Sequence, residues 1–290
     1  MTVEESPAVV TTAGLVADVT DTLAAAGVAS PRVEARWLVC HVLGCSAADL
    51  VRAADQTPTP AQVATVHRLA ERRVRREPLQ LVLGGTEFRG HRLALRPGVF
   101  IPRPETELLV DHAIGVLPAG GVAVEPCTGS GAVGCAIAIE RPDARVVATD
   151  VSAAAVALAV RNAERLGARV DVRSGVLLDP VPSELRGRVD VLVSNPPYLA
   201  EGDVEDLPIE VARWDPRDAL VAGPTGHEVS DKLIAAARHW LAPGGWLMLE
   251  LDERRVSAAA SRATAAGLRA AETRSDLTGR PRFLVARRAS

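Results

Sequence analysis

The architecture of this 290-residue chain follows from one stretch near its middle, Val124-Glu125-Pro126-Cys127-Thr128-Gly129-Ser130-Gly131. An apolar strand is expected over 122–126 and an apolar helix over 131–140, so the stretch forms the turn between them. Glycines let the backbone approach a ligand closely, and the N-terminus of the following helix faces that ligand. The stretch therefore predicts a nucleotide-type binding site, with an ordinary tight turn between strand and helix as the alternative.

Strands and helices continue to alternate after this turn. The sequence predicts further apolar strands at 145–149, 169–173, 189–194 and 245–251, and further helices at 152–166, 227–241 and 254–266. This alternation predicts an α/β fold with a parallel, doubly wound, Rossmann-like sheet. The end of the chain is different, because residues 268–273 and 279–286 predict a C-terminal antiparallel hairpin that closes the sheet.

The first part of the chain has helical patterns instead. The sequence predicts helices over 12–26, from Pro31, at about 46–54 and at about 60–76, which together form a small N-terminal helical bundle. Residues 87–93 predict a short hairpin with a turn near Gly90. We therefore expect three parts: a helical domain over 1–77, a β-hairpin connector over 78–101 and a ligand-binding α/β domain over 102–290. The first ten residues are expected to form a disordered tail.

The composition argues against several classes of protein. The formal charge of −3 argues against broad nucleic-acid binding, and we expect the basic run over 68–76 to be a solvated helix face, with contact to RNA or an acidic partner as the alternative. The four cysteines form no CxxC pair and have no histidine at metal spacing, so we expect reduced thiols and no metal. The sequence contains no run of about 18 or more apolar residues, so we expect no membrane span. Because Glu4 and Glu5 are unlike a signal peptide, we expect a cytoplasmic protein.

A carboxylate comes at the end of the second expected strand. Asp150 follows Ala148-Thr149, and at a strand end it can accept hydrogen bonds from both hydroxyls of a ribose. Residues 129–134 also match the GxGxxG pattern of dinucleotide-binding folds. These two features alone are therefore compatible with an NAD-dependent oxidoreductase as well as with other enzymes that bind a nucleotide-type cofactor.

The strand over 189–194 runs into a second motif, Asn195-Pro196-Pro197-Tyr198. The carboxyl edge of an open α/β sheet is where ligands bind. The Asn195 side-chain oxygen could accept one hydrogen of an amide –NH2, and the Pro196 carbonyl could accept the other. Tyr198 offers a flat wall for a planar group. We expect Asn195, Pro196 and Tyr198 to be the catalytic residues, with a plain turn as the alternative.

The chemistry of a planar nitrogen explains why such a motif would be useful. An amide nitrogen is a poor nucleophile because its lone pair is delocalised. Two fixed acceptors can turn the lone pair toward the methyl group of a sulfonium, and they stabilise the positive charge that develops on nitrogen. The motif therefore favours an N-methyltransferase that uses S-adenosyl-L-methionine. An oxidoreductase would give these residues no role.

Further motifs extend the pattern through most of the chain. They are Arg76-Glu77-Pro78-Leu79-Gln80, Phe88-Arg89-Gly90, Gly98-Val99-Phe100-Ile101-Pro102-Arg103-Pro104-Glu105-Thr106-Glu107, Asp215-Pro216-Arg217 and Pro243-Gly244-Gly245. With the glycine turn, Asp150 and the Asn-Pro-Pro-Tyr motif, they make the chain resemble the bacterial release-factor glutamine methyltransferases (HemK-type). The resemblance implies a class I methyltransferase fold and methylation of the glutamine amide in a Gly-Gly-Gln sequence of a release factor, which the N-terminal helical domain helps to dock.

The resemblance also implies which residues contact each ligand. Residues of the 98–107 motif should border the methionine end of the cofactor and the target. The full set expected to bind the cofactor is Phe100, Pro102, Arg103, Thr106, Glu125, Cys127, Thr128, Gly129, Gly131, Asp150, Val151, Val176 and Asn195. The residues expected to contact the substrate are Pro197, Tyr198, Glu210, Trp214 and His227.

The chain departs from the family pattern at the cofactor edge and in the substrate loop. Glu125 replaces the usual Asp, Val176 replaces an Asp near the adenine, and Ala212 replaces an Arg. Residues 223–228 read Gly-Pro-Thr-Gly-His-Glu where the family has Gly-Glu-Asp-Gly-Leu-Asp. These changes suggest a divergent paralogue with a shifted substrate. Residues 201–218 hold seven acids and two arginines, which would suit a cation, although a solvated polar loop is the alternative.

Two substrate classes therefore remain open for an N-methyltransferase. The first is the glutamine amide of a release factor. The second is a small amino-acid-like molecule, such as an amide, an amine or the guanidino group of L-arginine. A third interpretation of the Asn-Pro-Pro-Tyr motif is that the enzyme methylates adenine in DNA. The net charge and the small helical domain argue against this interpretation.

Overall fold

The computed structural model describes residues 10–290, so the tail expected for the first ten residues lies outside the described part, apart from Val10. The chain forms two compact units, residues 1–84 and 85–290. Within the described residues, no helix has both the length and the apolar character needed to cross a bilayer.

The first unit is a helical bundle whose helices begin at the residues that the sequence indicates. Thr11 caps the first helix by accepting the N–H of Gly14, and Thr59 with Gln62 forms a capping box at the fourth. Leu15, Val19 and Leu23 lie on one face and are fully buried, as their spacing predicts. The helices are α1 (Thr12–Ala25), α2 (Pro31–Leu43), α3 (Ala47–Arg52), α4 (Pro60–Val74) and α5 (Leu79–Val82).

The basic run on α4 is not only a solvated face, so that expectation is wrong for two of its arginines. Arg73 is 6% exposed and forms an ion pair with Glu34 of α2. Arg72 pairs with Glu77 and donates to the carbonyl oxygens of α5. These guanidinium groups satisfy buried acceptors and hold α4 against its neighbours, because a buried cation has to be paired.

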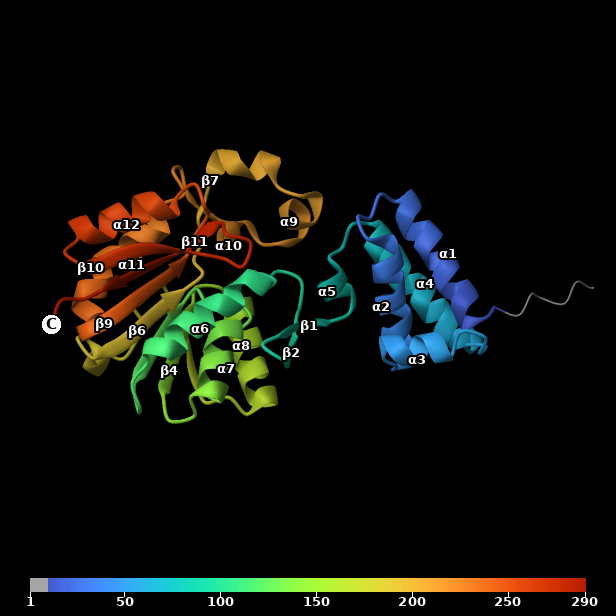
Figure 1. Ribbon diagram of the computed structural model, residues 1–290, viewed down its shortest axis with the longest axis horizontal. Coiled ribbons are helices and arrows are strands. Elements are labelled where there is room, and N and C mark those ends of the chain that lie inside the picture. The colour runs from blue at the N-terminus through green and yellow to red at the C-terminus, as the bar shows by residue number, and fades with distance from the viewer. Residues whose placement is uncertain (1–9) are drawn as a thin grey trace, which may run out of the picture. The chain divides into compact units, whose positions relative to one another are not determined.

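The second unit is built around a seven-stranded sheet in the order β10-β11-β9-β6-β3-β4-β5 (Figure 1). The five strands from β9 to β5 are parallel to one another, and β11 is antiparallel to both β9 and β10. This is the expected doubly wound sheet, closed by the C-terminal hairpin. The strands are β3 (Val122–Pro126), β4 (Arg145–Asp150), β5 (Val170–Ser174), β6 (Val189–Ser194), β9 (Leu241–Glu250), β10 (Arg269–Ser275) and β11 (Pro281–Arg287).

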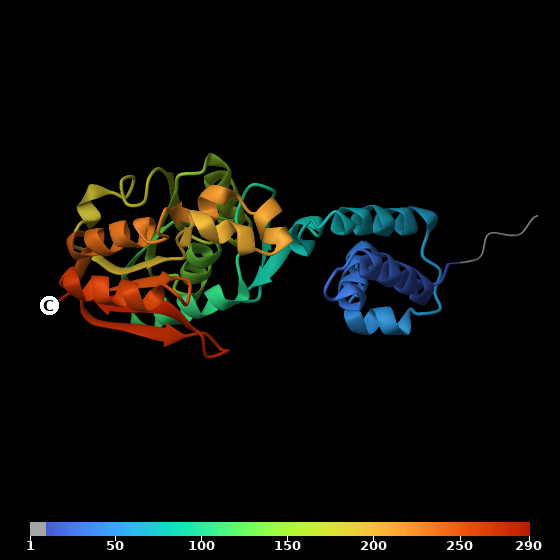
Figure 2. The same cartoon turned by 90° about the horizontal axis from the view of Figure 1, so that it is seen from above.

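Helices cover both faces of this sheet (Figure 1, Figure 2). One face packs on α6 and α7, and the other packs on α11 and α12. The sequence did not single out α6, which follows directly on the 3-10 turn η1 (Pro104–Thr106). The helices are α6 (Glu107–Val116), α7 (Ala132–Glu140), α8 (Ala153–Leu166), α11 (Glu228–Trp240) and α12 (Val256–Ala265).

The strand order brings the two sequence motifs together. β3 lies between β4 and β6, so the chain reverses direction across the sheet at β3, and ligands bind at such a switch point. The glycine turn follows β3, and the Asn-Pro-Pro-Tyr motif follows β6. The Ser194 hydroxyl donates to the Pro126 carbonyl at 2.6 Å, which ties the two strand ends together.

Two smaller segments complete the second unit. The expected hairpin is formed by β1 (Gly85–Phe88) and β2 (His91–Ala94), which pair antiparallel. A longer insertion after the Asn-Pro-Pro-Tyr motif returns to the sheet before α11. Its elements are β7 (Leu199–Ala200), η3 (Glu201–Asp206), α9 (Ile209–Trp214), α10 (Arg217–Leu220) and β8 (Val221–Gly223). A further 3-10 turn, η2 (Ser183–Leu185), lies before β6.

Candidate active site

Asp150, at the end of β4, accepts hydrogen bonds that hold the glycine turn in place. One carboxylate oxygen accepts the N–H of Gly129 at 2.9 Å, and the other accepts the N–H of Ser152 at 2.9 Å. Each oxygen has a second lone pair, so both can still accept from a ribose hydroxyl. Asp150 therefore links the conformation of the turn to the group that the sequence expects it to bind.

The turn itself approaches the next helix closely at Gly131. Gly131 has a φ of +81°, and a Cβ there would lie 3.1 Å from the Cα of Ala159 on α8. A side chain at this position would strain the backbone and also push against α8. Gly131 therefore lets the turn adopt this conformation and pack closely against α8.

Glu125 is turned toward its own loop. It is 3% exposed, and its Oε2 accepts the Thr128 hydroxyl at 2.6 Å and the Gly134 N–H at 2.8 Å. A Cβ at Gly134 would lie 2.6 Å from that oxygen, so the longer Glu side chain is accommodated by a glycine on α7. Burial raises the pKa of Glu125 to about 8, although the hydrogen bonds from Thr128 and Gly134 lower it.

This raised pKa predicts a pH-dependent stability. Because the pKa of Glu125 in the folded protein lies above the ordinary value of 4.5, folding favours the protonated form, and stability falls as the pH rises from about 4.5 to about 8. The group can remove up to about 1.4 kcal/mol per pH unit in that window. We expect Glu125→Gln to show a shallower decline in the free energy of unfolding, measured by urea denaturation at pH 6 and pH 8. Glu164→Gln, on the exposed side of α8, should keep the wild-type slope; equal slopes in all three proteins would contradict the prediction.

A cavity of about 440 Å³ opens beside these groups. This volume lies within the range of about 300–1,000 Å³ that is typical of small-molecule sites. Most of the residues expected to bind the cofactor are on its wall: Phe100, Pro102, Thr106, Glu125, Cys127, Thr128, Gly129, Asp150, Val151, Val176 and Asn195, together with Pro197 from the expected substrate set. The sequence did not single out Asp218, Leu177, Val229 or Lys232, which also line it.

Lys232 could have been noticed in the sequence, because it is the only lysine of the chain. The other expected site residues are not on the cavity wall: Arg103, Gly131, Pro196, Tyr198, Glu210, Trp214 and His227.

Arg103 lies behind the wall and joins two of the sequence motifs. Its guanidinium forms an ion pair with Asp215, and it also lies 4.9 Å from the ring centre of Phe100. Asp215 is 7% exposed, and its second oxygen accepts the N–H of Ile101 at 3.4 Å. Burial raises the pKa of Asp215, while the Arg103 charge lowers it. The pair fixes the 98–107 segment, and with it Thr106, at the edge of the cavity.

Asn195 is held in a defined orientation at the end of β6. Its side-chain Nδ2 donates to the Thr106 hydroxyl at 3.2 Å. With the nitrogen engaged in this way, the Asn195 oxygen is left to accept from a ligand. Tyr198 lies beyond the cavity wall, where Arg282 of β11 lies 5.8 Å from its ring centre. The structure therefore places Asn195 and Tyr198 in different surroundings, although they are three residues apart.

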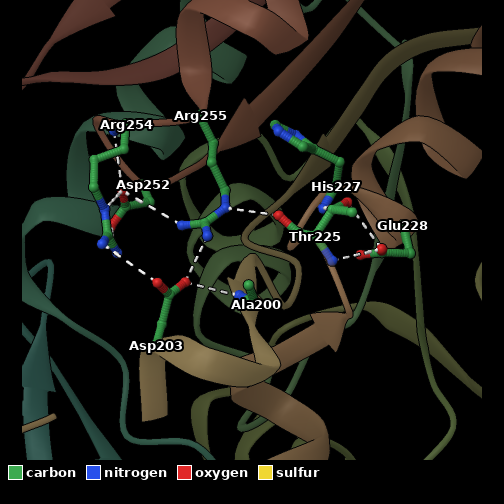
Figure 3. Close-up of polar contacts among 8 residues, drawn as sticks. All are labelled: Ala200, Asp203, Thr225, His227, Glu228, Asp252, Arg254 and Arg255. Carbon is green, nitrogen blue, oxygen red and sulfur yellow. Dashed lines mark hydrogen bonds and ion pairs between the residues drawn. The ribbon is translucent and has the colours of Figure 1, made fainter. Parts of the chain in front are cut away.

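A polar cluster holds the insertion that follows Tyr198 (Figure 3). Asp203 accepts the N–H of Ala200 at 2.8 Å and pairs with Arg254 and Arg255. Arg255 also donates to the Thr225 carbonyl at 3.2 Å. His227, which the sequence singled out as a substrate contact, lies in this cluster and not on the cavity wall.

Comparison with known proteins identifies the family. Residues 15–84 match the PrmC N-terminal domain, and residues 96–211 match the methyltransferase small domain. A release factor glutamine methyltransferase of Mycolicibacterium smegmatis is 42% identical over 271 residues, which span 93% of this chain and 95% of that protein. The chain belongs to the release factor glutamine methyltransferase family. Enzymes of the same name from Deinococcus radiodurans (41% identical, 95% of this chain and 98% of that protein) and Bordetella pertussis (42%, 86% and 92%) are similarly related.

Solved structures agree with the fold of this methyltransferase. A methyltransferase from Pyrococcus furiosus superposes with a TM-score of 0.52 at 24% identity and covers 70% of this chain and 91% of its own. The catalytic domain of hMettl16, in complex with an RNA hairpin, gives 0.54 at 16% identity, with coverage of 76% and 81%. At these identities the likeness shows the class I methyltransferase fold alone. Membership of a methyltransferase family also removes the oxidoreductase interpretation of the glycine turn.

Proposed function

We propose that this methyltransferase transfers the methyl group of S-adenosyl-L-methionine to the side-chain amide of a glutamine in a peptide chain release factor. The observation that carries the proposal is the orientation of Asn195. Its nitrogen is engaged by Thr106, so its oxygen is available to accept an amide N–H at the edge of the cavity. The names of the related enzymes support the choice of substrate.

The residues around the cavity fit the proposed cofactor. Asp150 offers two carboxylate oxygens to the ribose hydroxyls. Val151 and Val176 are 66% and 53% exposed although both line the cavity, and a planar base between them would cover this apolar surface. Because the side chain of Val176 cannot accept a hydrogen bond, we infer that apolar contacts and backbone groups hold the base here.

The proposed mechanism depends on orientation. The cofactor supplies an electrophilic methyl group on a sulfonium. Asn195 Oδ1 and the Pro196 carbonyl accept the two hydrogens of the glutamine amide and turn its lone pair toward that methyl group. The same two oxygens stabilise the positive charge that develops on nitrogen as its bond to the methyl carbon forms and the bond from that carbon to sulfur breaks. The nitrogen then loses one of its two hydrogens as a proton, which gives a neutral N-methyl amide. Tyr198 and Pro197 border the substrate in this proposal.

The alternative of a small cationic substrate has less support from the geometry. The acids of residues 201–218 suggested it, but Asp203 is paired with Arg254 and Arg255, and Asp215 is paired with Arg103. Glu210 also has a partner. Asp218 is the only acid of this segment that lines the cavity. Much of the acidic charge therefore stabilises the fold and is not directed at a ligand.

A direct transfer assay distinguishes the two substrates. Purified enzyme is incubated with methyl-labelled cofactor and a release factor, free L-glutamine or free L-arginine. We expect label only in the release factor, with peptide mass spectrometry placing it on the glutamine of the Gly-Gly-Gln sequence. A release factor with alanine in place of that glutamine is the control. Label in free arginine and none in the release factor would reject the proposal.

The N-terminal unit is proposed to dock the release factor. Val33 and Trp37 lie on successive turns of α2 and are 47% and 52% exposed, which gives this unit an apolar surface. In the same assay, we expect Trp37→Ala to raise the KM for the release factor and to leave the KM for the cofactor unchanged. An unchanged KM for the release factor would argue against docking through this surface.

A further inference from the structure

The Tyr198 ring contacts a charged side chain that the proposed mechanism does not use. The guanidinium carbon of Arg282, on β11, lies over the ring, 5.8 Å from its centre. A cation within about 6 Å of the centre of an aromatic ring is attracted to the face of that ring. Tyr198 also packs against the hydrophobic core between the sheet and the helices α11 and α12. The ring therefore lies between the core and a fixed positive charge.

Glu250, at the end of β9, holds the Arg282 side chain. Arg282 Nη2 lies 3.6 Å from Glu250 Oε1, and the two side chains are 16% and 0% exposed. Their backbones are fixed by the pairing of β9 with β11, in which Glu250 is opposite Phe283 and the N–H of Leu251 donates to the Arg282 carbonyl at 2.8 Å. Both charged side chains therefore start from neighbouring positions in the core of the sheet.

This buried pair is a poor source of stability. Within residues 10–290, neither oxygen of Glu250 has a hydrogen-bond partner, and the same is true of Arg282 Nε. Removing two charges from water is costly, and a buried ion pair offsets that cost only when hydrogen bonds satisfy its remaining donors and acceptors. The position of the guanidinium over Tyr198 offers another explanation for the pair.

The loop that carries Tyr198 does not fix its ring. The backbone N–H of Tyr198 donates to the Leu220 carbonyl at 3.2 Å, and β7 follows directly and pairs with β8. These contacts hold the backbone but leave the side-chain torsions to be set by neighbouring side chains. Arg282 is such a neighbour, and it comes from an element more than 80 positions away along the chain.

We propose that Arg282 is a positioning residue: Glu250 fixes its guanidinium, and the guanidinium holds the plane of the Tyr198 ring beside the target amide. This inference rests on the proposed function, in which Tyr198 borders the substrate. Arg282 and Glu250 act through Tyr198 and do not contact the reacting atoms.

Kinetics at pH 8 test the proposal. Burial raises the pKa of Glu250 to about 7, so this carboxyl is ionised at pH 8. The double variant Glu250→Gln/Arg282→Met removes both charges together, so that neither is left buried and unpaired. We expect it to lower kcat about 10- to 100-fold. The KM for the cofactor should change little, because Tyr198 is not on the cavity wall. Arg282→Lys keeps the positive charge and should retain most of the rate.

Two further variants separate positioning from a general structural effect. Arg287→Met is the matched control, because Arg287 lies at the other end of β11 and 5.3 Å from the ring centre of Trp246; its kcat should equal that of the wild type. When Tyr198→Ala is already present, Glu250→Gln/Arg282→Met should lower kcat by less than about twofold, because the ring that the pair positions is gone. An equal loss with and without the Tyr198 ring would overturn the proposal.

A second measurement needs neither substrate nor turnover. Tyr198 is the only tyrosine of the chain, so protein made with 3-fluorotyrosine has a single fluorine-19 NMR signal. We expect this signal to move in folded Glu250→Gln/Arg282→Met toward its position in the denatured protein, and to stay in place in Arg287→Met. An unchanged signal in the folded double variant would overturn the proposal. Failure of the proposed function would appear separately, as wild-type enzyme that does not methylate a release factor.

Discussion

Asn195→Ala is expected to lower kcat by about 10²- to 10³-fold, while the dissociation constant of the cofactor changes far less. In the proposed mechanism, the substitution removes the side-chain oxygen that accepts a substrate N–H, and only the Pro196 carbonyl remains to orient the amide. Because the target nitrogen is a poor nucleophile, the enzyme depends on this orientation more than it would with an amine. The interaction strengthens as charge develops on nitrogen, so the loss should appear mainly in kcat.

Single-turnover kinetics with labelled cofactor measure this loss. Calorimetry with S-adenosylhomocysteine on the same preparation measures cofactor binding, and thermal denaturation confirms that the variant is folded. The prediction is wrong if Asn195→Ala turns over at a rate near that of the wild type. A large rise in the dissociation constant with an unchanged kcat would assign Asn195 to cofactor binding instead.

Asp150→Ala is expected to weaken cofactor binding by at least about 100-fold. The variant would lose the two charge-assisted hydrogen bonds that the Asp150 carboxylate is proposed to accept from the ribose, each contributing about 1.5–3 kcal/mol. The variant also leaves the N–H groups of Gly129 and Ser152 without their acceptor, so the glycine turn loses its support from below. Both effects act in the same direction, because the proposed ribose contact and the observed contacts to the turn use one carboxylate.

The measurement is calorimetric titration with S-adenosylmethionine, S-adenosylhomocysteine and NAD. Asp150→Asn keeps one acceptor oxygen and should show an intermediate loss. Glu164→Ala removes an exposed acid from α8 and serves as the charge control. Binding of S-adenosylhomocysteine to Asp150→Ala with wild-type affinity would contradict the assignment of Asp150 to the ribose.

Several departures from the family pattern have a structural explanation that the sequence did not contain. Glu125 is longer than the usual Asp, and its carboxyl group bonds to Thr128 and to the backbone of Gly134. His227, which the sequence predicts to contact the substrate, lies with Arg255 in the cluster that holds the insertion. Changes at positions near a motif in sequence can therefore serve packing, because the direction of a side chain depends on its neighbours in space.

Glu250 is a fully buried acid that sequence reasoning missed. One signal was present, since an acid ends the otherwise apolar run Leu247-Met248-Leu249-Glu250. The hydrogen bond between Asn195 and Thr106 was missed as well, because the two residues are 89 positions apart along the chain and lie on different elements.

From the sequence by itself, the alternation of strands and helices around the glycine turn determined the α/β fold, and this turn with the Asn-Pro-Pro-Tyr motif predicted a nucleotide-type site with acceptors for a planar nitrogen. Those features depend on local periodicity and turn chemistry, which neighbouring residues encode directly. Only the tertiary structure decided that β3 lies beside β6, that Arg103 pairs with Asp215 and that Asn195 donates to Thr106. Such contacts join residues far apart in the chain, so they follow from strand order and from the pairing of buried polar groups, and no local pattern specifies them.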